Sequence, residues 1–142
     1  MIHPDVNLLL YAYDETSEFQ VDAAAWLEEV LTTEHVFFSW HTITGFLRII
    51  TNPKASSAPL TIGQAIDIVD SWLEPDNSHL VSLEKKNWPL FSKILVDGQA
   101  SGNLVMDAHI AAMAASCGAT VATTDRDFSR FSDVRIVDPL QA

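Results

Sequence analysis

Four aspartates stand where apolar runs of the chain meet turns or helix starts. Asp5 follows the apolar opening residues, and Asp107 lies within an otherwise apolar helical segment. Asp125 and Asp127 flank a single arginine in the run Thr-Thr-Asp-Arg-Asp-Phe. Acids that are scattered in sequence but placed at such junctions can meet at one edge of a sheet. A cluster of carboxylates is costly unless a hard cation neutralises it, so these residues indicate a Mg²⁺-type site and phosphate chemistry.

The elements that would position these acids are short apolar runs alternating with helical stretches. We expect strands at 1–3, 35–39, 79–83, 120–124 and 134–137. We expect helices at 7–13, 17–31, 41–51, 61–73, 87–96 and 103–117. Strands separated by helices imply right-handed crossovers and a parallel sheet covered on both faces. The predicted fold class is α/β, a three-layer α/β/α domain with a central, mostly parallel sheet, formed as one domain over residues 1–142.

Asp5 and Asp125 each directly follow a predicted strand. Because the carboxyl ends of parallel strands share one edge of a sheet, both acids are expected at that edge. Each also has a purely structural alternative: Asp5 suits a helix N-cap, and Asp125 suits a turn. Asn7 has the same ambiguity, since it either begins the helix or orients Asp5 through a hydrogen bond.

Asp107 is the acid that a structural role explains least well. Its segment, from Leu104 to Ala114, is otherwise almost wholly apolar. A carboxylate near a helix N-terminus gains some stabilisation from the helix dipole. Position 107, however, is expected to lie beyond the cap and among core residues. Metal ligation therefore explains this acid better than solvation does.

Hydroxyl and basic side chains surround the last two acids. Thr123 and Thr124 precede them, and their hydroxyls are candidates to bind a metal-bound water or a phosphate. Arg126 and Arg130 either contact phosphate or pair with nearby acids, and pairing is the favoured interpretation.

Composition bounds the class of protein. Hydrophobic residues make up 48% of the chain, which argues against disorder, and no apolar run approaches the roughly 20 residues of a membrane helix. The opening residues have no basic region of the kind that begins a signal peptide. A single cysteine excludes both an internal disulfide and a Cys-rich zinc site. We therefore expect a cytoplasmic protein with no membrane partner.

Charge and motifs narrow the function further. The net charge of −11 argues against a broad basic surface for nucleic acid, although it does not exclude a nuclease with a metal site. The five histidines are poorly spaced for zinc, and only His109, beside Asp107, is a candidate to approach a substrate. A receiver domain is disfavoured because no lysine follows Lys93, and an Asp-x-Asp phosphatase would need an acid where Asn7 stands.

Four segments together resemble the PIN-domain ribonucleases, of the VapC type found as toxins in bacterial toxin–antitoxin pairs. They are Asp-Val-Asn-Leu-Leu-Leu at 5–10, Gly-Phe-Leu-Arg-Ile-Ile-Thr-Asn-Pro at 45–53, Asp-Ala-His-Ile-Ala-Ala at 107–112 and Thr-Asp-Arg-Asp-Phe at 124–128. No single segment is decisive, but their order and spacing span nearly the whole chain.

The resemblance implies a metal-dependent endoribonuclease that cleaves structured RNA, such as tRNA or rRNA loops, through a Mg²⁺-activated water. Asp5, Asp107 and Asp125 would be the ligands of Mg²⁺ or Mn²⁺, and Asp127 would complete the catalytic set. The resemblance also implies a VapB-like antitoxin as partner and a homodimer.

One departure from the family pattern stands at Gly45. The family usually carries a Glu two or three residues before the Leu-Arg of the middle segment, and here no acid lies between His41 and Pro53. We therefore expect one firmly held metal and a weaker second one. The same departure supports an alternative, a catalytically weak PIN-fold module that binds RNA or an antitoxin protein.

Overall fold

The computed structural model describes residues 1–141 and contains a five-stranded sheet. Its strands lie in the order β3-β2-β1-β4-β5, and every neighbouring pair is parallel. The strands are β1 (Ile2–Pro4), β2 (Val36–Phe38), β3 (Ser78–Leu80), β4 (Thr120–Ala122) and β5 (Ile136–Val137). The chain builds the sheet outward from β1 in one direction and then from β4 in the other. The strand order therefore reverses between β1 and β4, which is where open α/β sheets form their ligand sites.

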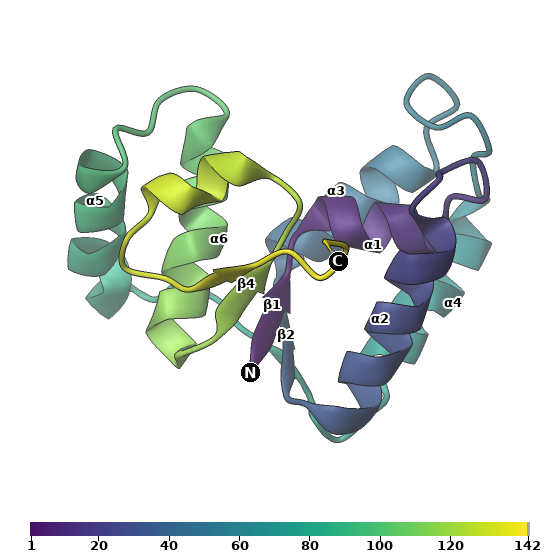
Figure 1. Ribbon diagram of the computed structural model, residues 1–142, viewed down its shortest axis with the longest axis horizontal. Helices are drawn as coiled ribbons and strands as arrows, with labels where there is room; N and C mark the ends of the chain where they lie inside the picture. Colours follow the sequence, from purple (N-terminus) through teal and green to yellow (C-terminus); the bar gives the residue numbers. More distant parts are fainter. Residues whose placement is uncertain (142) are drawn as a thin grey trace.

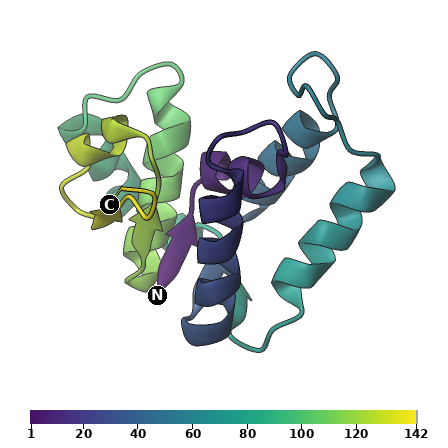
Figure 2. The ribbon, with the colours of Figure 1, turned by 45° about the vertical axis from the view of Figure 1, so that its right-hand side comes forward.

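Within residues 1–141, six α-helices and two 3₁₀ helices connect the strands. They are α1 (Val6–Tyr13), α2 (Gln20–Thr33), α3 (Trp40–Ile50), α4 (Ile62–Leu73), η1 (Lys85–Asn87), α5 (Trp88–Asp97), α6 (Leu104–Cys117) and η2 (Arg126–Arg130). Figures 1 and 2 show α5 and α6 on one side of the sheet, and α2 and α4 on the other. The three-layer α/β/α arrangement predicted from the sequence is confirmed.

Two apolar clusters fill the two sides of the sheet. One joins the first four helices to β2, and within it Trp72 of α4 stacks on Phe38 with ring centroids 5.3 Å apart. The other joins α5 and α6 to β4, and it contains Ile94, Met113 and Phe128. Both clusters are fully buried at their centres, so the strand ends between them are held rigidly.

Local sequence signals account for the ends of several helices. Ser39 and Thr61 each cap a helix through a capping box, the latter with Gln64. Gly118 ends α6 in the left-handed region at φ 71°, a conformation that glycine adopts without steric cost.

The predicted strand 79–83 was too long, because only Ser78–Leu80 pairs with β2. In α4, Ala65, Val69 and Trp72 are buried, whereas Ile62 and Ile66 are exposed. Among the helices formed by residues 1–141, none combines the length and the apolar character needed to cross a membrane.

Candidate metal centre

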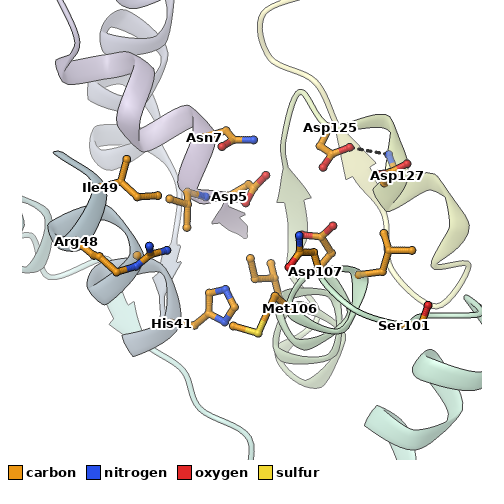
Figure 3. Close-up of a pocket in the computed structure, with 15 residues that line it drawn as sticks. Asp5, Asn7, His41, Arg48, Ile49, Ser101, Met106, Asp107, Asp125 and Asp127 are labelled. Carbon is orange, nitrogen blue, oxygen red and sulfur yellow. Dashed lines mark hydrogen bonds between the residues drawn. The ribbon is translucent and has the colours of Figure 1, made fainter. Parts of the chain in front are cut away.

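A cavity of about 660 Å³ opens at the carboxyl end of the sheet, where the strand order reverses. All four predicted aspartates line it, although they come from three separate segments of the chain. Figure 3 shows Asp5 at the start of α1, Asp107 on α6, and Asp125 and Asp127 together beyond β4. The convergence expected from strand ends is therefore present in the structure.

Asp5 is the most deeply held of these acids, with a side chain that is only 6% exposed. Its Oδ1 accepts a hydrogen bond of 2.7 Å from the backbone N–H of Val6, so it is also the N-cap of α1. Its Oδ2 accepts a hydrogen bond of 2.7 Å from the hydroxyl of Thr123. The same hydroxyl accepts a 3.0 Å hydrogen bond from the backbone N–H of Asp125. Thr123 thus ties the ends of β1 and β4 together at the site.

The other three acids form a compact group. Asp107, Asp125 and Asp127 each offer a carboxylate oxygen, and these oxygens all lie within 4.8 Å of one another. The backbone N–H of Asp127 donates to Asp125 Oδ1 at 2.9 Å, which fixes the carboxylate of Asp125 relative to the η2 turn. Asp5 lies outside this group but lines the same cavity.

The clustering leaves a clear electrostatic signature. Burial, followed by the negative charges of Asp5, Asp125 and Asp127, raises the pKa of Asp107 to about 6. Burial also raises the pKa of Asp5, and the Asp125 charge adds to this, while the hydrogen bonds from Thr123 and Val6 oppose it. The carboxylates therefore repel one another in the absence of a counter-charge. Among residues 1–141, no basic side chain forms an ion pair with any of the four.

The chemistry and spacing of these groups fit a hard divalent cation. Mg²⁺ binds oxygen ligands at about 2.1 Å, so two ligands on one ion lie no more than about 4.2 Å apart. The carboxylate oxygens of the three-acid group are close to that separation before any side chain moves. A cation among them would remove the repulsion that raises the pKa of Asp107. Asp107, Asp125 and Asp127, with Asp5 beside them, are thus the residues suited to hold it.

Comparison with known proteins identifies the family to which this site belongs. Residues 2–134 match the PIN domain, and the chain is 34% identical to ribonuclease VapC37 of Mycobacterium tuberculosis over 95% of this chain and 94% of that protein. The chain belongs to the VapC branch of the PIN-domain family. It is also 31% identical to ribonuclease VapC48 of the same species over 95% of this chain and 94% of that protein. The fold also resembles a chain in the crystal structure of VapBC2 from Rickettsia felis, which is bound to a DNA fragment from the VapBC2 promoter. The TM-score is 0.70 at 17% sequence identity, and the match covers 96% of this chain and 98% of that one.

Gly45 is where this PIN domain differs from the pattern expected of the family. It lines the cavity on α3, opposite the three-acid group. A Cβ atom at this position would lie 3.3 Å from Val6 Cγ2 and 3.7 Å from Val6 Cγ1. The Val6 side chain of α1 therefore packs close to α3 here, and a larger residue at position 45 would press on the residue next to Asp5.

The remaining cavity wall of this PIN domain carries nitrogen-bearing side chains. His41 and Arg48, both on α3, line the cavity and face the aspartates across it (Figure 3). His41 Nδ1 lies 3.1 Å from His109 Nδ1, and burial lowers the pKa of both imidazoles. From the sequence alone, His41 was not expected at the site, because only His109 was a candidate to approach a substrate. The place of His41 at the start of α3, directly after a strand, is the signal that locates it at the cavity.

Several other sequence expectations are resolved by the geometry. Thr123 was expected to offer its hydroxyl to a metal-bound water or a phosphate, but that hydroxyl is committed to Asp5 and Asp125. Asn7 lines the cavity but makes no hydrogen bond with Asp5, whose partners are Val6 and Thr123. Arg130 donates to the carbonyl oxygen of Gly98 at 2.9 Å rather than pairing with an acid.

Proposed function

We propose that this chain is a metal-dependent endoribonuclease that acts as the toxin of a type II toxin–antitoxin system. The observation that supports this most is the meeting of four carboxylates, drawn from three segments, in one cavity at the switch point of the sheet. Such a cluster is costly without a cation and is the donor set that Mg²⁺ or Mn²⁺ prefers. The VapC relatives, which are named ribonucleases, support the choice of RNA as substrate.

The residues of the chain have separable roles in this proposal. Asp107, Asp125 and Asp127, whose carboxylate oxygens already lie within 4.8 Å of one another, would hold the ion, and Asp5 beside them would complete the ligand set. When bound, a divalent cation lowers the pKa of a coordinated water and polarises the scissile phosphate. Thr123 keeps the Asp5 carboxylate aimed into the cavity by donating to its Oδ2. Arg48, exposed on the opposite wall, is placed to neutralise phosphate oxygens of the substrate.

The substrate class follows from the openness of the site and from RNA geometry. A phosphate of a single-stranded loop can be splayed into a cavity of this kind, whereas the same phosphate in a regular A-form helix is held in place by stacking. We therefore assign structured RNA, such as tRNA or rRNA cut in its loops, as the substrate, and the cytoplasm as the place of action.

A protein partner is part of the same proposal. The acidic chain, with a net charge of −11, would be inhibited by a VapB-like antitoxin that brings a basic side chain to the cavity. The structural similarity to the toxin–antitoxin pair VapBC2 supports this expectation. We further propose a homodimer as the working form.

The test is an RNA cleavage assay with end-group analysis. The purified chain should cut a structured RNA in Mg²⁺ or Mn²⁺, leave 5′-phosphate and 3′-hydroxyl ends, and lose all activity in EDTA. Asp5→Asn should abolish cleavage, whereas the control Asp67→Asn, which changes an exposed acid of α4, should not. Cleavage that persists in EDTA or leaves cyclic phosphate ends would refute the metal mechanism.

A second candidate function is favoured by Gly45. Without the family's acid at this position, the fold would serve as a binding module that has lost most of its catalysis. Calorimetry separates the two candidates. Divalent metal binding accompanied by cleavage rejects the binding module, and binding of RNA or antitoxin with no cleavage in any metal rejects the enzyme.

A further inference from the structure

Four aromatic rings form a continuous row that leads away from the metal cavity. The row begins at His41, which lines the cavity, and His109 meets it edge to face with ring centroids 5.1 Å apart. Phe91 of α5 stacks on His109 at 5.7 Å with an interplanar angle of 24°. Trp88, the first residue of α5, meets Phe91 edge to face at 5.8 Å. We call these four residues the aromatic row.

The outer end of the row is open to solvent. Trp88 is 59% exposed, while Trp72, on the other side of the sheet, is completely buried. Phe91, His109 and His41 are each half-buried, so the row is neither core nor fully free surface. A large exposed aromatic residue in contact with a row of further rings is a feature of binding surfaces rather than of folding.

Positive charge accompanies the outer end of the row. Lys85 and Lys86 of η1 are separated from Trp88 only by Asn87, and both lysines are exposed. The chain has only eight lysines and arginines, so two of them beside one exposed tryptophan form a local exception to the acidic surface. Lys86 has Glu84 at 3.5 Å, and among residues 1–141 Lys85 makes no ion pair.

We propose that the aromatic row receives unpaired bases of the RNA strand on one side of the scissile phosphate. This inference rests on the proposed ribonuclease function and deepens it by naming a substrate-binding surface. Aromatic rings stack on any base, and nearby lysines bind the phosphates between bases, which is the combination that binds single-stranded nucleic acid. The continuity of the row with the acid-lined cavity favours RNA over a protein as its occupant, since His41 belongs to both.

The geometry also predicts what the row would discriminate. Bases must be unstacked from a partner strand before they can lie on Trp88, so the row would select single-stranded segments and reject duplex. It would be tolerant of sequence, because every base has a π-face. Specificity for a particular cut site would then come from the shape of the RNA loop.

The experiment measures binding of a short, fluorescently labelled single-stranded RNA to the full chain in Ca²⁺, with a gel to verify that the strand stays intact. Trp88→Leu removes the stacking face but keeps an apolar side chain, and we expect it to weaken binding about five-fold or more. Trp88→Phe should recover most of that loss. The matched control Phe19→Leu, at an exposed aromatic residue before α2, should bind as the wild type does.

Two further measurements make the result specific. The double variant Lys85→Ala/Lys86→Ala should lower the slope of log affinity against log salt by about 1.4, because each phosphate contact on a single strand contributes about 0.7. Trp88→Leu should leave the affinity for a duplex RNA unchanged. Wild-type affinity of Trp88→Leu for the single strand, or an equal loss for single strand and duplex, would overturn the proposal.

The outcome is separable from that of the proposed function. If the wild type fails to cleave RNA but Trp88→Leu still loses single-strand affinity, the ribonuclease proposal fails and the aromatic row stands as an RNA-binding surface. If the wild type cleaves RNA and Trp88→Leu binds normally, the row is rejected and the ribonuclease stands. Loss of a copurifying protein partner from Trp88→Leu, with unchanged RNA affinity, would reassign the row to that protein and refute the RNA assignment.

Discussion

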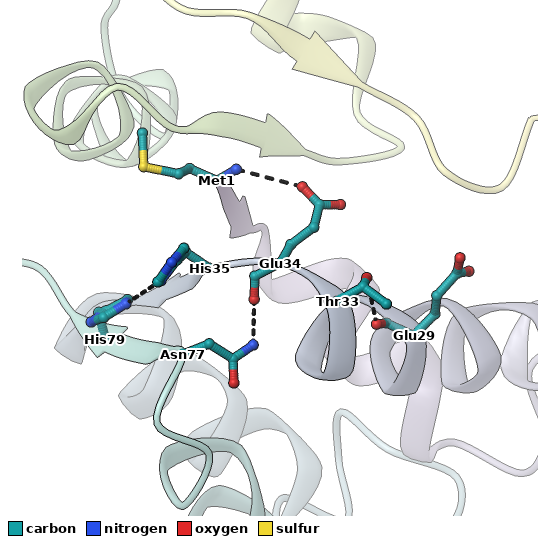
Figure 4. A network of polar contacts seen from close by, with 7 residues as sticks. All are labelled: Met1, Glu29, Thr33, Glu34, His35, Asn77 and His79. Atoms are coloured by element: carbon teal, nitrogen blue, oxygen red, sulfur yellow. Dashed lines mark hydrogen bonds and ion pairs between the residues drawn. The ribbon is translucent and has the colours of Figure 1, made fainter.

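Polar side chains are arranged differently at the two ends of the sheet. At the amino end, complementary groups meet. The Met1 amine lies 3.5 Å from Glu34 Oε1, the Asn77 amide donates to the carbonyl oxygens of Leu31 and Glu34, and His35 and His79 approach to 2.8 Å (Figure 4). At the carboxyl end, four carboxylates line one cavity with no basic partner in the described residues.

This difference indicates that the polar groups at the amino end stabilise the fold, whereas those at the carboxyl end bind a ligand. At the amino end, Asn77 satisfies two backbone carbonyl oxygens and the Met1 amine meets a carboxylate, so these contacts stabilise the chain. At the carboxyl end, burial and then neighbouring carboxylates raise the pKa of Asp107 and of Asp5, and the metal-free protein therefore gives up stability at neutral pH to keep these acids together. A site that lowers stability in this way is expected to be functional.

Asp107→Asn should cause the largest loss of activity and, at the same time, a gain in the stability of the metal-free protein. Loss of a metal ligand should lower RNA cleavage by at least about 100-fold, beyond what supporting hydrogen bonds usually contribute. The same change removes a carboxylate from a repulsive cluster, so it should stabilise the metal-free protein at pH 7 by about 1 kcal/mol after solvent screening. Urea unfolding in EDTA and cleavage in Mg²⁺ measure the two effects.

The pH dependence of that stability has a defined sign. The pKa of Asp107 is raised from 3.8 to about 6 in the folded chain, so between these values the folded state binds more protons than the unfolded state. Stability conferred by this group is therefore greatest at low pH and is lost as pH rises through about 6. The stabilising effect of Asp107→Asn should appear at pH 7 and vanish near pH 4. A gain of equal size at both values would contradict the repulsion argument.

Thr123→Val should weaken metal binding without removing any carboxylate. The hydroxyl donates to Asp5 Oδ2 at 2.7 Å and accepts from the Asp125 backbone at 3.0 Å, so its loss frees both acids. We expect a 10- to 100-fold loss of Mn²⁺ affinity by calorimetry, a range of about the size seen for supporting hydrogen bonds. We also expect a loss of about 2 kcal/mol in stability, because a buried charged group loses a donor.

The neighbouring threonine provides the control for Thr123. Thr124→Val changes the next residue in the chain, whose side chain makes no hydrogen bond among residues 1–141. Its Mn²⁺ affinity should match that of the wild type. Equal losses in the two valine variants would show that the strand end, rather than the Thr123 hydroxyl, is what supports Asp5.

Gly45→Glu should sharpen the contrast by adding an acid to the carboxyl end. The new Cβ would lie 3.3 Å from Val6 Cγ2, a tight contact that requires the Val6 side chain to shift by a few tenths of an ångström. A second Mn²⁺ should then bind in calorimetry, whereas Gly45→Gln, with the same length and no charge, should bind only one. Wild-type stoichiometry in Gly45→Glu would mean that this position does not reach the metal.

Much of this architecture was predictable because its signals are local. Alternating apolar runs and helical stretches indicated the layers, and Thr61 and Gly118 marked helix ends through capping and left-handed geometry. Asp5 and Asp125 were expected at one edge because parallel strands share their carboxyl ends. Their convergence with Asp107 followed from the fold class and the family resemblance together.

What could not be predicted depends on contacts between distant segments. The pairing of His41 with His109 joins residues 68 positions apart and leaves no local pattern. Thr123 was recognised as chemically relevant, but its commitment to Asp5, 118 positions away, exists only after β1 and β4 pair. The exposure of Ile66 was also beyond local signals, because helical periodicity shows which residues share a face but not how wide a surface the neighbouring elements cover.

Asn77→Ala should produce the smallest functional effect, and it tests whether contacts at the amino end of the sheet contribute to stability alone. Its amide donates to the Leu31 carbonyl oxygen at 2.9 Å and to that of Glu34, at the end of α2 (Figure 4). Removing it should cost about 1 kcal/mol in urea unfolding, the usual size for such hydrogen bonds. RNA cleavage and Mn²⁺ affinity should not change, because β2 and β3 still pair and the carboxyl end is untouched. A loss of metal affinity in Asn77→Ala would show that the two ends of the sheet are energetically coupled, and the division between a structural end and a ligand-binding end would then fail.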